Sequence, residues 1–315
     1  MTARVLVIGE ALVDMVRPPG GDAYASPGGS PANVAVGLGR LDVPTALLTR
    51  LGRDAAANII STHLARDGVE LLATVDDEPT SVADADVDLV GNAGYAFDVH
   101  WELSEAALGA LDLAALRCVH TGSIAAVQSP GAEVVHRLVR QLHSGATISY
   151  DPNCRPSLMG AAETVRPSVG AMLTAADIVK ASDEDLAFLY PGTPVFEAAE
   201  RWAASGPALV VLTQGALGYR AWNGAGTVTG AAVPVDVEDT VGAGDAFMSA
   251  LLAGLHDRDL LGAARRSELR MLSAEVLAEV LHEAAVAAAI TCSRPGADPP
   301  SAAELAAAVT EKRPN

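Results

Sequence analysis

The segment Asp239-Thr240-Val241-Gly242-Ala243-Gly244-Asp245-Ala246-Phe247 decides how the rest of the sequence is interpreted. It follows an extended stretch, 231–237, and precedes an apolar run, 246–255, whose spacing predicts a buried helix. Gly242 and Gly244 stand where the chain must turn from one into the other, and glycine permits the backbone angles of such a turn. The segment therefore predicts a glycine-rich entry into a helix.

The start of this helix also carries the chemistry that the sequence suggests. The backbone amides of Gly242, Ala243, Gly244 and Asp245 would be unpaired donors at a helix N-terminus, which is a ready anion site. The Asp245 carboxylate lies in the same ring of donors. A general base beside a bound phosphate is what phosphoryl transfer to an alcohol requires. A glycine-rich turn followed by an ordinary first-turn acid is the alternative that this segment alone leaves open.

Apolar runs and helical patterns alternate along most of the chain. Continuous apolar runs predict buried strands at 4–9, 45–50, 117–122, 146–151, 177–180 and 208–213. Helical spacing of apolar residues predicts helices at 31–41, 55–67, 131–144, 163–175, 246–255 and 273–291. The stretches 218–222 and 227–235 predict an antiparallel continuation of the sheet. This order predicts an α/β domain with a central, mostly parallel sheet and helices on both of its faces.

Two segments interrupt this alternation. The first, 11–26, is broken by prolines and glycines and predicts a hairpin. In the second, aspartates alternate with valines and alanines over 82–90, a period that suits a half-exposed antiparallel strand. We interpret segments of about 11–27 and 69–102 as a small β-sheet lid inserted into one domain, 1–310, with 311–315 as a loose C-terminal tail. A plain surface hairpin is the alternative for the second segment.

Composition excludes several classes of function. The net charge is −18 and no cluster of Lys and Arg relieves it, which argues against nucleic-acid binding. Cys118, Cys154 and Cys292 are far apart and form no CxxC motif, as expected for thiols in a reducing compartment. No apolar segment is long enough to span a membrane. We therefore expect a soluble, cytoplasmic protein.

Two signatures resemble those of the ribokinase-like, or pfkB, family of carbohydrate kinases. The segment 239–247 looks like the C-terminal signature, and Gly28-Gly29-Ser30-Pro31-Ala32-Asn33-Val34-Ala35 looks like the N-terminal one. They stand in the family's order and at its spacing, and the resemblance extends over 5–300. It implies a three-layer α/β/α ribokinase-like fold with a small β-sheet lid. It also implies that the γ-phosphate of ATP is transferred to a sugar hydroxyl.

The resemblance also implies roles for single residues. Those matching the family's sugar-binding residues are Asp14, Gly28, Gly29 and Asn33, and Asp245 matches the general base within the anion hole of 242–245. Arg155, in the segment 151–156 (DPNCRP), would neutralise phosphate charge or reach an acidic group of the substrate. Positions that match the nucleotide side are Asn153, Lys180, Ser182, Thr213, Gly215, Gly218, Gly242 and Gly244.

The predicted cofactors are ATP and Mg²⁺, with K⁺ as a further option. In the family, an Asn followed three residues later by Glu holds the metal and phosphates; here Ser182 and Asp185 take those places. This departure puts the metal role of Asp185 in doubt and makes Glu184 an equal candidate for a water-mediated contact with Mg²⁺. A serine-capped, acidic start of a helix is the structural alternative. Asp239 corresponds to a monovalent-cation site in some members.

The substrate that we favour is fructose, phosphorylated at a primary hydroxyl. The segments 9–14, 151–155 and 95–103 all look fructokinase-like. 2-Keto-3-deoxygluconate, ribose and a nucleoside are the alternatives within the same class. A non-catalytic protein that binds sugar or a partner protein is the alternative from another class, and a homodimer paired through the lid is left open.

Overall fold

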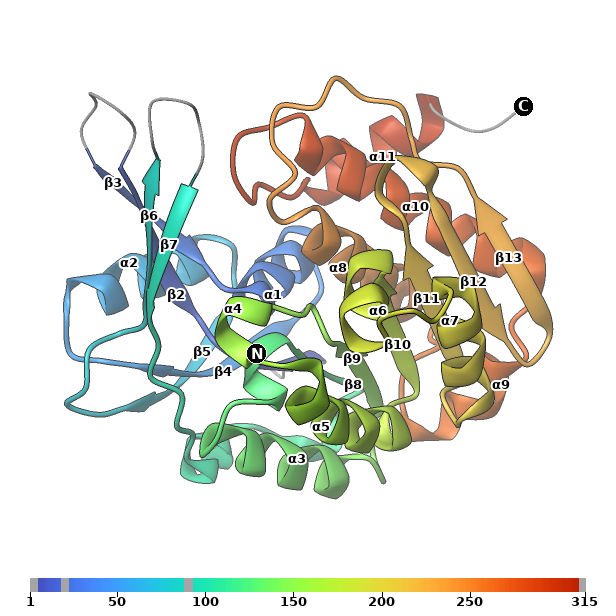
Figure 1. Ribbon diagram of the computed structural model, residues 1–315. Helices are drawn as coiled ribbons and strands as arrows, with labels where there is room; N and C mark the ends of the chain where they lie inside the picture. The colour runs from blue at the N-terminus through green and yellow to red at the C-terminus, as the bar shows by residue number, and fades with distance from the viewer. Residues whose placement is uncertain (1–4, 18–22, 88–92, 312–315) are drawn as a thin grey trace.

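The computed structural model of the chain describes residues 5–17, 23–87 and 93–311 (Figure 1). Its main body contains a nine-stranded sheet. In spatial order the strands are β13 (Gly226–Gly230), β12 (Tyr219–Asn223), β11 (Leu209–Thr213), β10 (Ile178–Ser182), β9 (Thr147–Asp151), β8 (Cys118–Gly122), β1 (Val5–Ile8), β4 (Thr45–Leu51) and β5 (Glu70–Val75). Neighbours are parallel from β11 to β5, and β12 and β13 continue the sheet antiparallel. The predicted α/β fold with a mostly parallel sheet is confirmed.

Helices cover both faces of this sheet. Those packed on one face are α1 (Ser30–Arg40), α2 (Ala55–Arg66), α8 (Ala243–Asp257) and α10 (Ala274–Cys292). Those packed on the other are α3 (Gly131–Leu142), α5 (Ala162–Ala175), α6 (Asp183–Leu189) and α7 (Val195–Ala204). The remaining helices are the short α4 (Pro156–Met159) and α9 (Arg266–Arg270), and the C-terminal α11 (Ala302–Glu311). Five 3₁₀ turns complete the described chain: η1 (Glu105–Ala110), η2 (Leu113–Ala115), η3 (Ser123–Ala126), η4 (Gly215–Leu217) and η5 (Ala263–Arg265).

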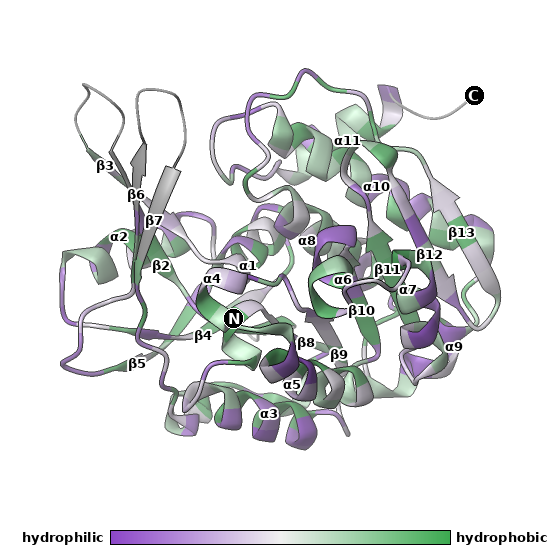
Figure 2. Ribbon diagram, viewed as in Figure 1, coloured by the Kyte–Doolittle hydropathy of each residue, from purple (hydrophilic) through white to green (hydrophobic). Residues whose placement is uncertain are grey.

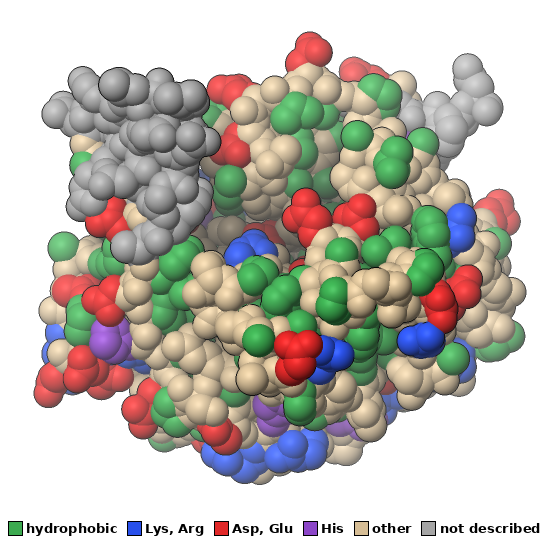
Figure 3. Space-filling view, in the orientation of Figure 1, with side chains coloured by type: hydrophobic (Ala, Val, Ile, Leu, Met, Phe, Trp, Pro, Cys, Tyr) green, Lys and Arg blue, Asp and Glu red, His purple; other side chains and the backbone are tan. Residues whose placement is uncertain are grey.

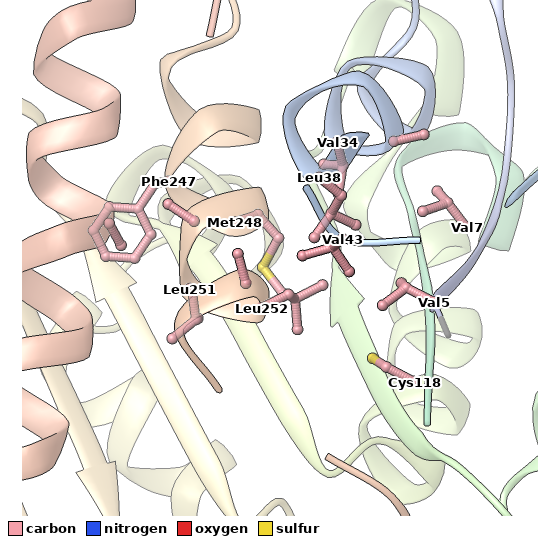
Figure 4. Packing of buried hydrophobic residues seen from close by; sticks show 14 of the residues in the cluster. Val5, Val7, Val34, Leu38, Val43, Cys118, Phe247, Met248, Leu251 and Leu252 are labelled. Atoms are coloured by element: carbon pink, nitrogen blue, oxygen red, sulfur yellow. The ribbon is translucent and has the colours of Figure 1, made fainter. Parts of the chain in front are cut away.

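The strands are apolar on both sides because each side faces a helical layer. In β1, Val5 and Val7 belong to the core under α1 and α8, whereas Leu6 and Ile8 belong to the core under α3 and α5. Figure 4 shows the first of these cores, where side chains of α1 and α8 meet those of the sheet. Figure 2 shows the same division, with hydrophilic residues on the outer side of helices such as α3. Because successive side chains of a strand point to opposite faces of the sheet, each strand contributes residues to both cores.

A separate four-stranded sheet forms the lid and stands away from the main body (Figure 1). Its spatial order is β3 (Tyr24–Gly28), β2 (Leu12–Arg17), β6 (Val82–Val87) and β7 (Ala93–Asp98). The hairpin predicted at 11–26 is present as antiparallel β2 and β3. The assignment of 69–102 to the lid is wrong at its start, because β5 pairs with β4 in the large sheet. A strand that continues a buried parallel sheet gains more burial than a lid strand would.

The C-terminal part and several helices differ from the sequence-based prediction. Helices α4, α7, α9 and α11 were not predicted, and α6 was given only as the structural alternative for its segment. Helix α11 includes Glu311, so the predicted loose tail cannot begin there. The rest of that tail, 312–315, lies outside the described residues. Within 5–17, 23–87 and 93–311, no helix is both long and apolar enough to cross a bilayer.

Candidate active site

Residues from several strands meet at the carboxyl-terminal edge of the large sheet. Glu10 follows β1, Ser123 follows β8, Asp151 ends β9 and Lys180 lies in β10, while Asp245 joins them from the first turn of α8. Because these strands are parallel, their ends share one edge, where open α/β sheets bind ligands. Figure 3 shows this side of the molecule hollowed near its centre, with basic and acidic side chains at the rim.

Asp245 is held by the first turn of α1. Ser30 Oγ donates a hydrogen bond to Oδ1 at 2.7 Å, and Asn33 Nδ2 donates to Oδ2 at 2.9 Å. Burial raises the pKa of the Asp245 carboxyl, and the bonds from Asn33 and Ser30 oppose that rise. A fixed, buried carboxylate with a raised pKa is suited to take a proton from an alcohol. Asn33 is predicted to bind the sugar, and in this structure its side-chain amide donates to Asp245.

The start of α8 offers open backbone donors. Gly242 is the N-cap, with a left-handed φ of 76° and no side-chain cap. The amides of Gly244 and Asp245 have no acceptor among the described residues. The amide of Ala243 is not unpaired as predicted, because it donates to the Thr240 carbonyl at 3.3 Å. A helix N-terminus with open amides attracts anions.

Lys180 places a positive charge beside these amides. A Cβ built on Gly244 would lie 3.4 Å from Lys180 Nζ, which locates the ammonium group at the start of α8. Nζ also lies 2.8 Å from Asp151 Oδ2, and both side chains are buried. Burial raises the pKa of Asp151 to about 6 although Lys180 lowers it. Burial lowers the pKa of Lys180, but the nearby carboxylates, Asp151 first, together outweigh burial and the net pKa is raised, so the ammonium stays charged.

In this structure the segment predicted to bind metal forms a helix cap, as in the structural alternative. Ser182 Oγ accepts from the Asp185 amide at 3.0 Å, and Asp185 Oδ2 accepts from the Ser182 amide at 2.7 Å, which is a capping box. Asp185 Oδ1 accepts from the Cys154 amide at 2.6 Å. Both carboxylate oxygens are thus engaged, whereas the Glu184 side chain is exposed. Within residues 5–17, 23–87 and 93–311, no three His, Cys, Asp or Glu side chains form a group that could hold a metal.

The loop after β9 carries two polar side chains with open capacity. Asn153 has a left-handed φ of 36°, and its buried Nδ2 has no hydrogen-bond partner. Arg155 is exposed, and its Nη1 donates to the carbonyls of Cys154 at 3.0 Å and Asn153 at 3.3 Å. The positive charge of Arg155 lowers the pKa of both Glu10 and Asp245, so it lies within their electrostatic reach.

The lid brings Asp14 against the glycine pair that opens α1. A Cβ on Gly28 would lie 2.1 Å from Asp14 Oδ2, so only glycine lets this carboxylate approach. Gly29 has a φ of 99°, and a Cβ there would lie 2.7 Å from the Glu10 carbonyl oxygen. Burial raises the pKa of Asp14 to about 6. No described residue hydrogen-bonds to the Asp14 carboxyl group, which leaves it available to ligand hydroxyls.

Two further predicted sites lie along the same edge. At the end of β11, Thr213 Oγ1 donates to the Ala181 carbonyl at 3.4 Å, and Gly215 and Gly218 have φ of 51° and 95° in the turn that follows. Asp239 joins the loops before α8 and after α10, because its carboxylate accepts from the amides of Val241 at 3.0 Å and Gly296 at 2.9 Å.

Comparison with known proteins decides the family. The model of the pfkB family carbohydrate kinases matches residues 2–304. The chain belongs to the pfkB family of carbohydrate kinases. As a member it is a phosphotransferase with an alcohol group as acceptor, and the resemblance of its two signatures is confirmed.

Relatives of this pfkB family member include fructokinases. The chain is 32% identical over 262 residues to fructokinase from Klebsiella pneumoniae, covering 81% of this chain and 85% of the relative. The structure of fructokinase with bound ATP from Xylella fastidiosa matches with a TM-score of 0.86 and 25% identity, covering 98% of both chains. A fructokinase double mutant from Vibrio cholerae O395, in a form with bound fructose, ADP and potassium ion, matches with a TM-score of 0.78 and 26% identity, covering 97% and 98% of the two chains.

Sequence reasoning on this pfkB kinase gave no role to three site residues, although it placed Glu10 at the ligand-binding end of the first strand. Ser30 and Asp151 stand within quoted segments, but their partners are 215 residues away for Ser30 and on a neighbouring strand for Asp151. Glu10 is 4% exposed, and burial raises the pKa of its carboxyl to about 7. Its position directly after the first buried strand was the available signal.

Proposed function

We propose that this chain transfers the γ-phosphate of ATP to a primary hydroxyl of fructose, with Asp245 as the general base. The observation that carries the proposal is the juxtaposition of a buried, doubly hydrogen-bonded Asp245 with open amides and the Lys180 ammonium. Positioning and electrostatic stabilisation supply most of the catalysis in phosphoryl transfer. This cluster supplies both.

The proposed reaction begins with the sugar hydroxyl against Asp245. The hydroxyl oxygen attacks the γ-phosphorus, its proton passes to the Asp245 carboxylate, and the bond from the γ-phosphorus to the bridging oxygen of ADP breaks. Ser30 and Asn33 fix the direction of the carboxylate, so the base does not have to reorient during the reaction.

Charge that builds on the transferring phosphoryl group would face fixed donors. The open amides of Gly244 and Asp245 and the ammonium of Lys180 lie together at the start of α8, where fixed donors could meet that charge without large rearrangement. Arg155 lies within electrostatic reach of Asp245 and would add a further positive charge on the substrate side.

The described residues fit Mg²⁺ held mainly by phosphates and water. Mg²⁺ commonly binds through one or two carboxylates plus substrate phosphates, and it would neutralise phosphate charge when bound. Glu184 is the exposed carboxylate available to its water shell, whereas Asp185 is engaged in the helix cap. The monovalent-cation role of Asp239 is part of the proposal, supported by the potassium ion named for the V. cholerae relative.

Fructose is proposed over other sugars for two reasons. Several curated relatives at 30–34% identity are named fructokinases. The fructose named in the V. cholerae structure is bound by a protein of the same fold. Asp14 is proposed to accept from sugar hydroxyls, since its carboxylate is partly buried at the lid and has no hydrogen-bond partner among the residues that the structure describes.

The test is ATP consumption with Mg²⁺ and fructose, 2-keto-3-deoxygluconate, ribose or adenosine as acceptor. We expect turnover to be highest with fructose. Asp245→Asn should lower kcat by roughly 10²- to 10⁴-fold, because a general base contributes this much. Asp257→Asn, at the exposed end of the same helix, is the matched control and should keep full activity. Turnover with another sugar would correct the substrate, and unchanged turnover in Asp245→Asn would refute the base.

A further inference from the structure

Glu10 is a buried acid that has no role in the proposed reaction, and one of its carboxyl oxygens, Oε2, has no hydrogen-bond partner. Glu10 lies two residues after the end of β1 and is 4% exposed. The Ser123 hydroxyl lies close enough to lower the pKa of this carboxyl group, but Oε2 has no hydrogen-bond partner. A buried polar atom without a partner costs free energy, and such atoms are few in native proteins. A partner in another state of the site would account for it.

The surroundings of Glu10 are built for this carboxyl group. Ser123 has a φ of 51°, a left-handed conformation that is costly for a residue with a side chain and that holds its hydroxyl at the end of β8. Two charged side chains act on Glu10: Arg155, from the loop after β9, and Asp245, from α8. Lys180, the next cation along the edge, is already paired with Asp151. Arg155 is therefore the cation available to Glu10.

The guanidinium of Arg155 likewise has hydrogen-bond donors that lack a charged partner among the described residues. Its side chain is exposed, and within the described part of the chain its hydrogen bonds go only to the backbone carbonyls of Asn153 and Cys154. No described carboxylate pairs with it. Because β9, β8 and β1 are neighbours in the sheet, the loop that carries Arg155 lies two strands from Glu10, with Ser123 between them. An arginine side chain is long enough to turn across such a distance.

We propose that Glu10 is a positioning residue for Arg155, whose guanidinium turns inward onto the unpartnered Oε2 of Glu10 when sugar and nucleotide occupy the site. The inference rests on the proposed function, in which Arg155 lies on the substrate side. Glu10 itself stays beneath the site and touches no substrate. Its effect on turnover comes from fixing the guanidinium in one orientation, in which the remaining donors of the planar fork face the phosphates.

Pairing changes the protonation of Glu10. Burial raises the pKa of its carboxyl to about 7, so a large fraction of the molecules carry the proton at neutral pH when the site is open. The guanidinium favours the carboxylate, so the O–H bond of Glu10 breaks on binding and the proton passes to a buffer base. Substrate binding at pH 7 should therefore release up to about half a proton that is traceable to Glu10.

Calorimetric titration measures this proton directly. Fructose is titrated into protein holding Mg²⁺ and a non-hydrolysable ATP analogue, at pH 7, in two buffers of different ionisation enthalpy. We expect proton release in the wild type, and its loss in both Glu10→Gln and Arg155→Gln. Glu133→Gln, an exposed acid on α3, is the control and should release as many protons as the wild type. Arg155 is exposed, so the Arg155→Gln protein should fold even if Glu10→Gln does not.

Kinetics separate positioning from a merely structural role. Glu10→Gln should lower kcat/KM for fructose by roughly 10- to 100-fold, as expected for a misplaced site group. In the wild type, kcat/KM should change with pH near pH 7 because Glu10 titrates there. This change should be absent in Glu10→Gln. Equal proton release in wild type, Glu10→Gln and Arg155→Gln overturns the inference, as does wild-type kcat/KM in Glu10→Gln. If proton release depends on Glu10 and Arg155 but no sugar is turned over, the proposed function is refuted and the inference stands. If neither proton release nor turnover is observed, the proposed function and the inference are both refuted.

Discussion

Replacing Lys180 with methionine should destabilise this kinase strongly at pH 8. Nζ of Lys180 lies 2.8 Å from Oδ2 of Asp151, and the two side chains are only 4% and 3% exposed. Methionine fills a similar volume without the charge, so the Asp151 carboxylate stays buried and loses its cation. Removing one partner of a buried pair costs about 3–5 kcal/mol. We expect the free energy of unfolding at pH 8 to fall by this amount.

The loss should shrink as the pH falls. Burial raises the pKa of Asp151 to about 6 even with Lys180 beside it, because Lys180 only partly opposes that rise. Without Lys180 the folded-state pKa rises further. A carboxyl group with a raised folded-state pKa costs stability as the pH rises through that pKa, and the cost disappears when it is protonated. The destabilisation of Lys180→Met should therefore be at least about 1 kcal/mol smaller at pH 5 than at pH 8.

Urea unfolding at both pH values measures these terms. The set comprises wild type, Lys180→Met, Asp151→Asn and the double variant, in which no buried charge is left unpaired and most of the stability should return. Arg201→Met removes the cation of an exposed pair with Glu197, whose side chains are 64% and 51% exposed, and should change stability by less than about 1 kcal/mol. A loss below about 1 kcal/mol in Lys180→Met at pH 8, or an equal loss at both pH values, would refute the reasoning.

Three further predictions follow from the same site. Gly242→Ala should lower the free energy of unfolding by about 1–3 kcal/mol and reduce kcat, because φ is 76° and the new Cβ would lie 2.5 Å from Ala297 Cβ; wild-type values in urea and in turnover would contradict this. Gly28→Ala should raise the KM for fructose by roughly 10- to 100-fold with little loss of stability, since the new Cβ would displace the end of the Asp14 side chain and press lightly on the Leu12 side chain; an unchanged KM would count against the sugar role of Asp14. In the wild type, burial raises the pKa of Glu10 from 4.5 to about 7, so its contribution to stability should decline between these pH values, by about 3 kcal/mol in all. Glu10→Gln should lack that decline, and identical pH dependence of the two unfolding curves would exclude it.

The sequence predicted the large sheet well because its strands are buried on both faces. Continuous apolar runs such as 4–9 have no competing interpretation as amphipathic helices, and the structure has β1 within that range. The segment 70–75 was misassigned because its neighbours in sequence are lid strands, while its partner in space is β4. Pairing between strands depends on topology that periodicity alone does not contain.

The candidate site was predictable in its residue types but not in its hydrogen bonds. Asp245 and Asn33 were both named from motifs, yet only the fold shows that the Asn33 amide reaches Asp245 across 212 positions of the chain. At Ser182 and Asp185, the same residues are compatible with a metal-binding segment and with a helix cap, and the structure contains the helix cap. Local sequence reports such a cap reliably because its partners lie within one turn.

The acidic total charge of this chain does not oppose binding of a polyanion, because two of the acids at the site are partly neutralised where they stand. Burial raises the pKa of Glu10 to about 7, so this carboxyl group is about half protonated near neutral pH. Asp151 is also paired with Lys180. What a phosphate meets at the edge of the sheet is therefore the open amides of α8 and the two cations, in a low-dielectric setting where fixed donors act most strongly. Many of the other described acidic side chains are exposed, so water and salt screen their contribution to the net charge of −18.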